Sequence, residues 1–142
     1  MVLLKIKKIH DRAILPRYAH EGDAGLDLCS VENVALPPGE KKLIPTGISI
    51  QIPEGHVGLI WDRSGFAAMH GLHTLAGVVD SGYRGEIKVV LINLGKDTMQ
   101  IQEGMRIAQL LIQPIVSVEV AETDQLDQTK RGEGGFGSTG RH

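Results

Sequence analysis

The sequence has 142 residues with a formal net charge of −2 at neutral pH, and 42% of them are hydrophobic. This length and hydrophobic content predict a single domain, residues 1–142, with its own core. The charge balance excludes the strongly basic field of many proteins that bind nucleic acid or anionic membranes. The single cysteine, Cys29, excludes an internal disulfide, and no run of residues approaches the length of a membrane span. We therefore expect a cytoplasmic protein that binds neither nucleic acid nor membrane.

Short runs with β-type patterns recur along the chain, separated by glycine, proline, aspartate and asparagine. Such a series of short strands is typical of a sandwich, a jelly roll or a barrel. The exception is SGFAAMHG, where Ser64 resembles an N-cap and Gly71 a stop signal, so we expect one short helix there. The expected strands cover residues 3–9, 42–45, 47–52, 56–61, 86–94, 106–113 and 115–120.

Two of these strands are apolar on both faces in places, namely residues 86–94 (EIKVVLINL) and 106–113 (RIAQLLIQ). A strand that is apolar on both faces needs cover on both sides. Aromatic residues, which could supply that cover, make up only 4% of the chain. The pattern therefore favours a homo-oligomer.

The segment HEGDAGLDLCS places Glu21, Asp23 and Asp27 close together in a stretch broken by glycine. These carboxylates could meet a divalent cation, although solvation of a loop is the commoner role for such residues. His70 and His73 form an H-x-x-H pattern without a further ligand nearby in the sequence, which makes a zinc site a minor alternative.

Two further segments carry residues with possible chemical roles. In WDRSGFA, Arg63 and Ser64 stand where a strand passes into the expected helix, a place that offers a guanidinium, a hydroxyl and backbone N–H groups to an anion. In GVVDSGYRGEI, Asp80 precedes a Ser-Gly turn and is followed by Tyr83. Asp80 is either a turn former or a functional carboxylate, and Arg63 is either solvent-facing or an anion ligand.

The end of the chain, RGEGGFGSTG, is rich in glycine but is not a P-loop, because Ser138 stands where that motif requires lysine and no apolar strand precedes it. Two interpretations remain. The segment is a flexible tail, as most glycine-rich termini are, or a tail that becomes ordered over a bound ligand. The second is favoured by Arg131, Phe136, Ser138 and Thr139, since a plain spacer needs no cation, no aromatic ring and no hydroxyl groups.

Taken in order, AGLDL, DRSG, GVVDSGYRGEI, RIAQLL and RGEGGFGSTG resemble the ordered motifs of the trimeric dUTPase family, the deoxyuridine triphosphate nucleotidohydrolases. The resemblance covers most of the chain. It implies an all-β, jelly-roll-like subunit, a homotrimer with active sites at subunit boundaries, and a mobile C-terminal arm at residues 124–142. It also implies Mg²⁺-dependent hydrolysis of dUTP to dUMP and pyrophosphate, which limits uracil incorporation into DNA and supplies dUMP for dTMP synthesis.

The resemblance also implies individual roles. Asp80 would be the general base that activates water for attack on the α-phosphorus, Tyr83 would pack against the deoxyribose, and Asp27 would reach Mg²⁺ only through water, the ion being held by the triphosphate. Phe136 would stack on uracil in a site of a neighbouring subunit. The remaining substrate contacts would come from Arg63, Ser64, Gly65, Gly77, Val78, Val79, Lys88, Gln109, Arg131, Gly137, Ser138 and Thr139.

Two rival functions stay open on the sequence alone. Deoxycytidine triphosphate deaminases share the superfold but carry a catalytic glutamate on the strand after the hairpin, where this sequence has Val90. A non-catalytic jelly-roll module is the second rival, because a fold does not determine a function. Asp80, Arg63 and the complete tail motif argue against it.

Overall fold

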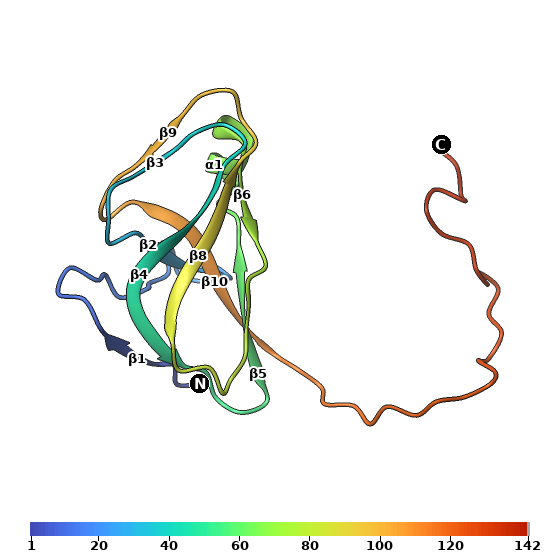
Figure 1. The fold of residues 1–142 in the computed structure, drawn as a ribbon. Coiled ribbons are helices and arrows are strands. Elements are labelled where there is room, and N and C mark those ends of the chain that lie inside the picture. Colours follow the sequence, from blue (N-terminus) through green and yellow to red (C-terminus); the bar gives the residue numbers. More distant parts are fainter. Residues whose placement is uncertain (142) are drawn as a thin grey trace.

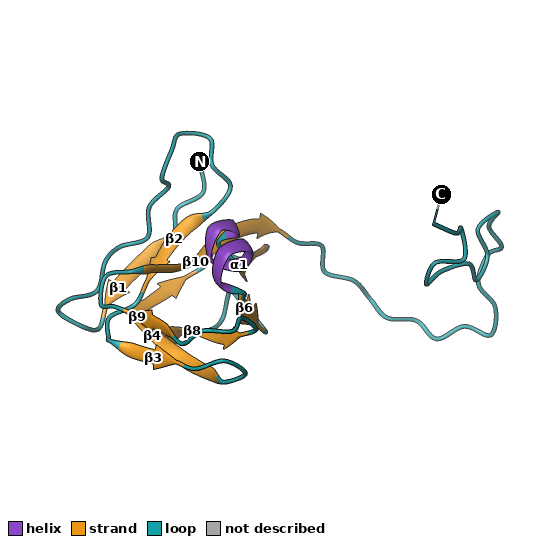
Figure 2. Cartoon of the chain, turned by 90° about the horizontal axis from the view of Figure 1, so that it is seen from above, coloured by secondary structure: helices purple, strands orange, loops and turns teal. Residues whose placement is uncertain are grey.

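The computed structural model describes residues 1–141 as a β-sandwich followed by an extended tail (Figures 1 and 2). Its two four-stranded antiparallel sheets have the strand orders β1-β4-β8-β6 and β2-β10-β5-β7, and β3 pairs with β9 beside them. The elements are β1 (Lys5–Lys8), β2 (Leu26–Cys29), β3 (Val34–Leu36), β4 (Lys41–Gln51), β5 (His56–Trp61), α1 (Ser64–His70), β6 (Leu72–Leu75), β7 (Val78–Val79), β8 (Glu86–Asn93), β9 (Met99–Ile101) and β10 (Arg106–Pro114). The all-β prediction with one short helix is confirmed.

The core lies between the two large sheets and follows from the alternation of their strands. Along β8, Ile87, Val89 and Leu91 are almost completely buried, while the residues between them face outward. Leu110 on β10 and Ile44 on β4 meet them in the same hydrophobic cluster. Since successive side chains of a strand point to opposite faces, a single buried face is enough to fix the register of each sheet.

Strand β4 joins two runs that the sequence predicts as separate strands, residues 42–45 and 47–52. Gly47 has a φ of 72°, and the pairing with β8 shifts between Pro45 and Ser49. Glycine adopts this left-handed conformation without steric cost, so the strand continues through a bulge. Pro45 therefore lies inside a strand and not at its end.

The helix begins one residue away from its predicted cap. Arg63 occupies the N-cap position with an extended backbone and makes no side-chain capping bond, so the prediction of Ser64 as N-cap is wrong. Ser64 is instead the first helical residue, and its side chain is exposed. The predicted stop is confirmed, because Gly71 adopts a φ of 70° and its N–H bonds back to the carbonyl groups of Phe66 and Ala67.

The predicted strand at residues 115–120 is wrong. Regular structure ends at Pro114, and Val116, Val118 and Val120 are exposed in a segment that leaves the sandwich (Figure 1). Alternation alone does not make a strand when no neighbouring strand is present to pair with it. The last residue of the predicted arm, His142, lies outside the described residues. No helix within residues 1–141 is long and apolar enough to cross a membrane.

Candidate active site

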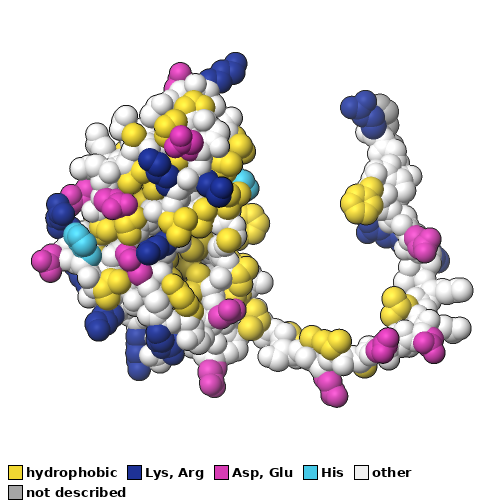
Figure 3. All heavy atoms as spheres, viewed as in Figure 1, with side chains coloured by type: hydrophobic (Ala, Val, Ile, Leu, Met, Phe, Trp, Pro, Cys, Tyr) yellow, Lys and Arg dark blue, Asp and Glu magenta, His cyan; other side chains and the backbone are white. Residues whose placement is uncertain are grey.

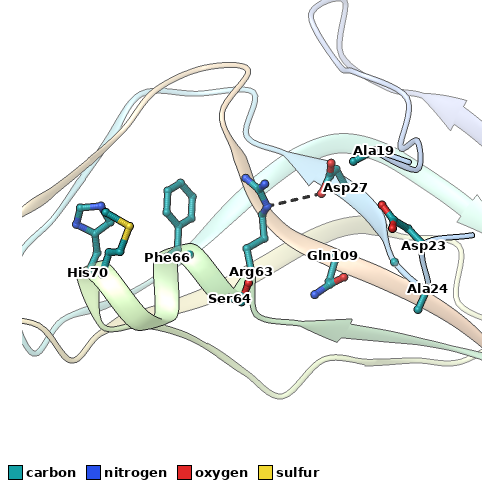
Figure 4. A pocket seen from close by; sticks show the side chains of 12 residues that line it. Ala19, Asp23, Ala24, Asp27, Arg63, Ser64, Phe66, His70 and Gln109 are labelled. Carbon is teal, nitrogen blue, oxygen red and sulfur yellow. Dashed lines mark ion pairs between the residues drawn. The ribbon is translucent and has the colours of Figure 1, made fainter. Parts of the chain in front are cut away.

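A cavity of about 450 Å³ opens beside α1, between β2, the segment that precedes β2, and β10 (Figure 4). We call it the phosphate cavity, because the residues predicted to contact phosphate lie in its wall. Several predicted site residues from distant parts of the chain share its wall. They are Asp27, Arg63, Ser64, Gly65 and Gln109.

The guanidinium of Arg63 is held in place from three sides. Its Nε lies 3.6 Å from a carboxylate oxygen of Asp27, and its Nη1 donates to the main-chain oxygen of Arg106 at 3.2 Å. The ring of Phe66, one helical turn further on, lies 5.7 Å from the guanidinium carbon. A cation above an aromatic ring is attracted by the ring's quadrupole. Arg63 is therefore oriented before any anion arrives.

Asp27 lies between two arginines. Its second carboxylate oxygen is 3.4 Å from Nη1 of Arg106, and only 14% of its side chain is exposed. Within residues 1–141 no group of three or more histidine, cysteine, aspartate or glutamate residues is placed to hold a metal ion. Asp23 accepts the backbone N–H of His20 at 2.9 Å, which closes a local turn. Both aspartates of this wall are therefore engaged by groups of the chain itself.

Gln109 enters the phosphate cavity because residue 25 is a glycine. A Cβ atom at Gly25 would overlap the side chain of Gln109, including the Cβ of Gln109 itself. The side-chain amide of Gln109 donates to the main-chain oxygen of Asp62 at 2.8 Å. Strands β2 and β10 pair at this point, with Gln109 opposite Asp27. The glycine of AGLDL therefore leaves the space that the glutamine of RIAQ occupies.

The carboxylate of Asp62, next to Arg63, is bound to strand β6. One oxygen accepts the N–H and the hydroxyl of Thr74 at 2.6 and 2.8 Å, and the other lies 2.6 Å from Nδ1 of His73. Burial raises the pKa of Asp62, but the hydrogen bonds from His73 and Thr74 outweigh it, and the pKa lies below its usual value. His70 packs against Phe66 instead, so the two histidines of the H-x-x-H pattern face different partners.

A second cavity, of about 510 Å³, is lined by the segment that joins β6 to β7, by the turn after β7 and by the start of β8. We call it the base cavity, because the residues predicted to read the nucleobase lie in its wall. Ala76 and Gly77 turn the chain there with φ values of 57° and 104°, and the Gly77 carbonyl accepts the N–H of Ile60 at 2.8 Å. The predicted residues in its wall are Gly77, Val78, Val79, Asp80, Tyr83 and Lys88.

Tyr83 and Asp80 face this cavity from one tight turn. The Tyr83 hydroxyl donates to the Glu86 carbonyl at 2.9 Å, and its ring lies against Gly85, where any Cβ would collide with it. The Asp80 carbonyl accepts the N–H of Tyr83 at 3.1 Å, which closes the turn and leaves the Asp80 side chain exposed. The turn thus presents a fixed ring beside a carboxylate that water can reach.

The tail residues lie in neither cavity. Arg131, Phe136, Gly137, Ser138 and Thr139 are exposed on a segment that extends away from the sandwich (Figure 2). The segment consists of consecutive turns, in which Gly134, Ser138 and Gly140 each donate to the carbonyl three residues earlier.

Sequence reasoning missed several residues that shape these cavities. Arg106 belongs to RIAQ, but only Gln109 of that motif is predicted to act. The partners of Asp62 are about twelve residues away and no periodic pattern connects them, although Asp62 itself is an unusual residue before RSG. Phe66 and Gly25 become informative only when the fold brings Arg63 and Gln109 against them.

Comparison with known proteins identifies the family. The dUTPase family model matches residues 11–140. The deoxyuridine 5'-triphosphate nucleotidohydrolase of Clostridium kluyveri is 56% identical over 139 residues, which cover 96% of this chain and 97% of that protein. The chain belongs to the dUTPase family. The resemblance inferred from the ordered motifs is therefore confirmed.

Solved structures agree with this membership. The Staphylococcus bacteriophage 80alpha dUTPase with dUPNHPP superposes with a TM-score of 0.88 at 33% identity, covering 98% of this chain and 99% of that chain. A mutant of the dUTPase from phage phi11 of S. aureus, which coordinates a structural Mg(II) ion, has a TM-score of 0.82 at 31% identity and covers 87% and 97%. The predicted jelly-roll-like subunit is that of the family.

Proposed function

We propose that this dUTPase-family chain hydrolyses dUTP to dUMP and pyrophosphate. The observation that carries the proposal is the division of the predicted residues between two prebuilt cavities. One presents Arg63, Ser64 and Gln109, which suit phosphate oxygens, and the other presents Asp80 beside the fixed ring of Tyr83. Together they supply an anion-binding region and a water-accessible carboxylate, as hydrolysis of a nucleoside triphosphate requires.

The base cavity would select the nucleoside and activate the water. The apolar side chains of Ile60 and Leu75 in its wall suit a flat base, while the backbone at residues 77–79 would read the polar edge of that base. Tyr83 would pack against the deoxyribose. Asp80 takes a proton from the attacking water as the new bond to the α-phosphorus forms, an ordinary role for an ionised carboxylate.

The phosphate cavity would stabilise the negative charge that develops on the departing pyrophosphate. As the bond from the α-phosphorus to the bridging oxygen breaks, its electron pair moves onto the departing pyrophosphate. The Ser64 hydroxyl would donate to that bridging oxygen, while Arg63 and Gln109 would hold the phosphate chain. Hydrogen-bond donors that are held in position before the reaction stabilise developing charge without reorganisation. Arg63 is such a donor, because Asp27 and the carbonyl of Arg106 already orient its guanidinium group.

We assign Mg²⁺ as the cofactor. When bound to the triphosphate it neutralises phosphate charge, and Asp27 would reach it only through water. The ion pairs of Asp27 with Arg63 and Arg106 support this indirect role, because a carboxylate shared by two guanidinium groups has little free capacity for a direct metal bond.

The two cavities belong to different sites of a homotrimer in this proposal. Within one chain the predicted residues line two separate cavities, so a complete site would combine the phosphate cavity of one copy with the base cavity of another. Hydrophobic side chains are visible on the surface of the sandwich (Figure 3). Among the exposed ones is Leu43, which is 59% exposed and lies opposite Val90 where β4 pairs with β8. Exposed apolar surface of this kind marks protein contacts.

The tail would complete the site as an arm, for which we retain the predicted bounds 124–142. Phe136 would cover the base of a site that another copy builds, and Arg131, Ser138 and Thr139 would reach the γ-phosphate. Their exposure on a segment beyond the sandwich supports this role, because a side chain without contacts in the folded body is available to a ligand elsewhere. We also retain the cytoplasm as the site of action.

A direct assay tests the proposed activity. The full chain is incubated with Mg²⁺ and either dUTP or dCTP, and pyrophosphate and ammonia are measured. We expect pyrophosphate from dUTP and no ammonia from dCTP. Ammonia release from dCTP would support the deaminase alternative, and the absence of both products would favour a non-catalytic module.

A further inference from the structure

Asp62 lies where the chain passes from one cavity to the other. Ile60 lines the base cavity and Arg63 lines the phosphate cavity, and only Trp61 and Asp62 separate them. Strand β5 ends at Trp61 and α1 begins at Ser64, so Asp62 belongs to neither element. Its position is fixed by its side chain and by its main-chain contacts.

Both oxygens of the Asp62 carboxylate contact residues of strand β6. The carboxylate accepts the N–H and the hydroxyl of Thr74 on one oxygen and contacts His73 on the other, all within 2.8 Å. Thr74 is buried, which protects two of these three bonds from water. Bonds to an ionised acceptor are stronger than those between neutral groups. The junction between β5 and α1 is therefore tied firmly to β6.

Asp62 also contacts the opposite wall of the phosphate cavity. Its carbonyl oxygen accepts the side-chain amide of Gln109 at 2.8 Å. A single residue thus links Arg63 and Ser64 along the chain, Gln109 on β10, and Thr74 on β6. Two residues after Thr74 the chain turns at Ala76 and Gly77 into the short strand β7, which Asp80 follows directly.

We propose that Asp62 is a positioning residue for dUTP hydrolysis, which fixes the phosphate-binding residues relative to the turn that bears the general base. This proposal rests on the proposed function. In the proposed homotrimer, each copy contributes its phosphate cavity to one site and its base cavity to another. If the contacts of Asp62 are lost, the residues on both sides of it can shift, and both halves of every site are affected. Asp62 itself touches neither the substrate nor the water.

The competing role for Asp62 is simple stabilisation of the fold, and kinetics per active site separate the two. Sites are titrated with a nonhydrolysable dUTP analogue, and kcat is expressed per titrated site at a temperature well below the melting transition. Since a misplacement of about 1 Å can cost roughly 100-fold, we expect Asp62→Ala to lower kcat per site by about 10- to 100-fold. Asp11→Ala, which removes an exposed aspartate outside both cavities, should keep kcat within about twofold of the unmodified chain.

An Asp62→Ala variant with unchanged kcat per site overturns the proposal, even if its melting temperature falls. Absence of turnover in the unmodified chain overturns the proposed function as well, so the two failures are distinguishable. If Asp62→Ala does not fold, Thr74 carries the test, because Thr74→Val removes the hydroxyl donor at nearly constant volume and Thr74→Ser keeps it. We expect Thr74→Val to lower kcat per site by about 3- to 10-fold and Thr74→Ser to restore it, since one hydrogen bond to a charged group is involved. Equal kcat values for these two variants overturn the proposal.

Discussion

The sandwich and the tail both carry predicted substrate ligands, but they hold them in opposite ways. In the sandwich, Arg63 is fixed by Asp27, Arg106 and Phe66, and Tyr83 is fixed by its bond to Glu86. In the tail, the hydrogen bonds of Arg131 within residues 1–141 all go to Gly134, three residues away, and Phe136 is fully exposed. The ligands in the sandwich are held by contacts of the sandwich itself, whereas the proposed arm would gain its partner when the substrate binds.

This difference has a thermodynamic reason. Ordering a glycine-rich segment costs more conformational entropy than ordering any other, and Gly132, Gly137 and Gly140 all adopt positive φ angles. Without a ligand nothing offsets that cost. A closing arm that orders on binding excludes water and commits the substrate.

The largest effect is expected from the sandwich. Asp80→Asn should lower kcat by at least about 10³-fold, because general-base catalysis contributes roughly 10²- to 10⁴-fold and Asp80 is the proposed base. Binding of a nonhydrolysable dUTP analogue and the melting temperature should change little, since the exposed side chain can be replaced by one of equal size. Single-turnover kinetics and calorimetry measure both. A variant with the kcat of the unmodified chain would exclude Asp80 as the base.

The next largest effect is expected from the tail. Deletion of residues 131–142 should lower kcat/KM by about 10²-fold or more, because the ring, the cation and the water exclusion of the arm are lost together. The melting temperature should stay within about 2 °C of the full chain, since the exposed segment contributes little buried surface. A large fall in melting temperature would show that the tail is part of the folded body.

Mixing these two inactive proteins tests whether the arm serves another copy. After co-refolding of tail-deleted chains with Asp80→Asn chains, some sites combine an intact tail with an intact Asp80. Partial recovery of activity is therefore expected, measured against each protein refolded alone. No recovery would mean that each arm serves the base of its own chain or does not reach the site, and the arm proposed here would then be wrong.

The sequence identifies the family through its ordered motifs, but it locates the strands only in part. The fold brings Gln109 into one cavity with Arg63 and Ser64, which lie far from it in the chain. The long strands β5, β8 and β10 are evident from their apolar runs. The short strands β3, β7 and β9 have no more than three residues each, too few to show a period.

What the sequence could not predict depends on partners brought together by the fold. Residues 115–120 alternate as a strand should, but no strand of the sandwich pairs with them, and they extend into solvent. Ser64 has the chemistry of an N-cap, yet the extended backbone of Arg63 takes that position. The three bonds of Asp62 join β6 to a loop, which no local pattern records.

A smaller effect should distinguish a glycine of the sandwich from one of the tail. Gly25→Ala places a Cβ on the side chain of Gln109, and overpacking of about 1–3 kcal/mol should lower the melting temperature by roughly 3–10 °C. Gly135→Ala has open space around it and should change the melting temperature by no more than about 1 °C. Differential scanning calorimetry of the two variants checks this. Equal shifts would contradict the division between an organised sandwich and a tail without contacts.

The smallest effect concerns the choice between dUTP and UTP, for which the two aromatic rings should behave differently. Tyr83 is fixed against Gly85, so its ring can exclude a 2′-hydroxyl by volume, and Tyr83→Ala should reduce the ratio of the kcat/KM values for dUTP and UTP by about 10-fold or more. Phe136 would contact only the base, which both nucleotides share. Phe136→Ala should therefore lower both kcat/KM values and leave their ratio within about twofold. A ratio that changes with Phe136 and not with Tyr83 would place sugar selection in the tail, and the division of roles between sandwich and arm would have to be reversed.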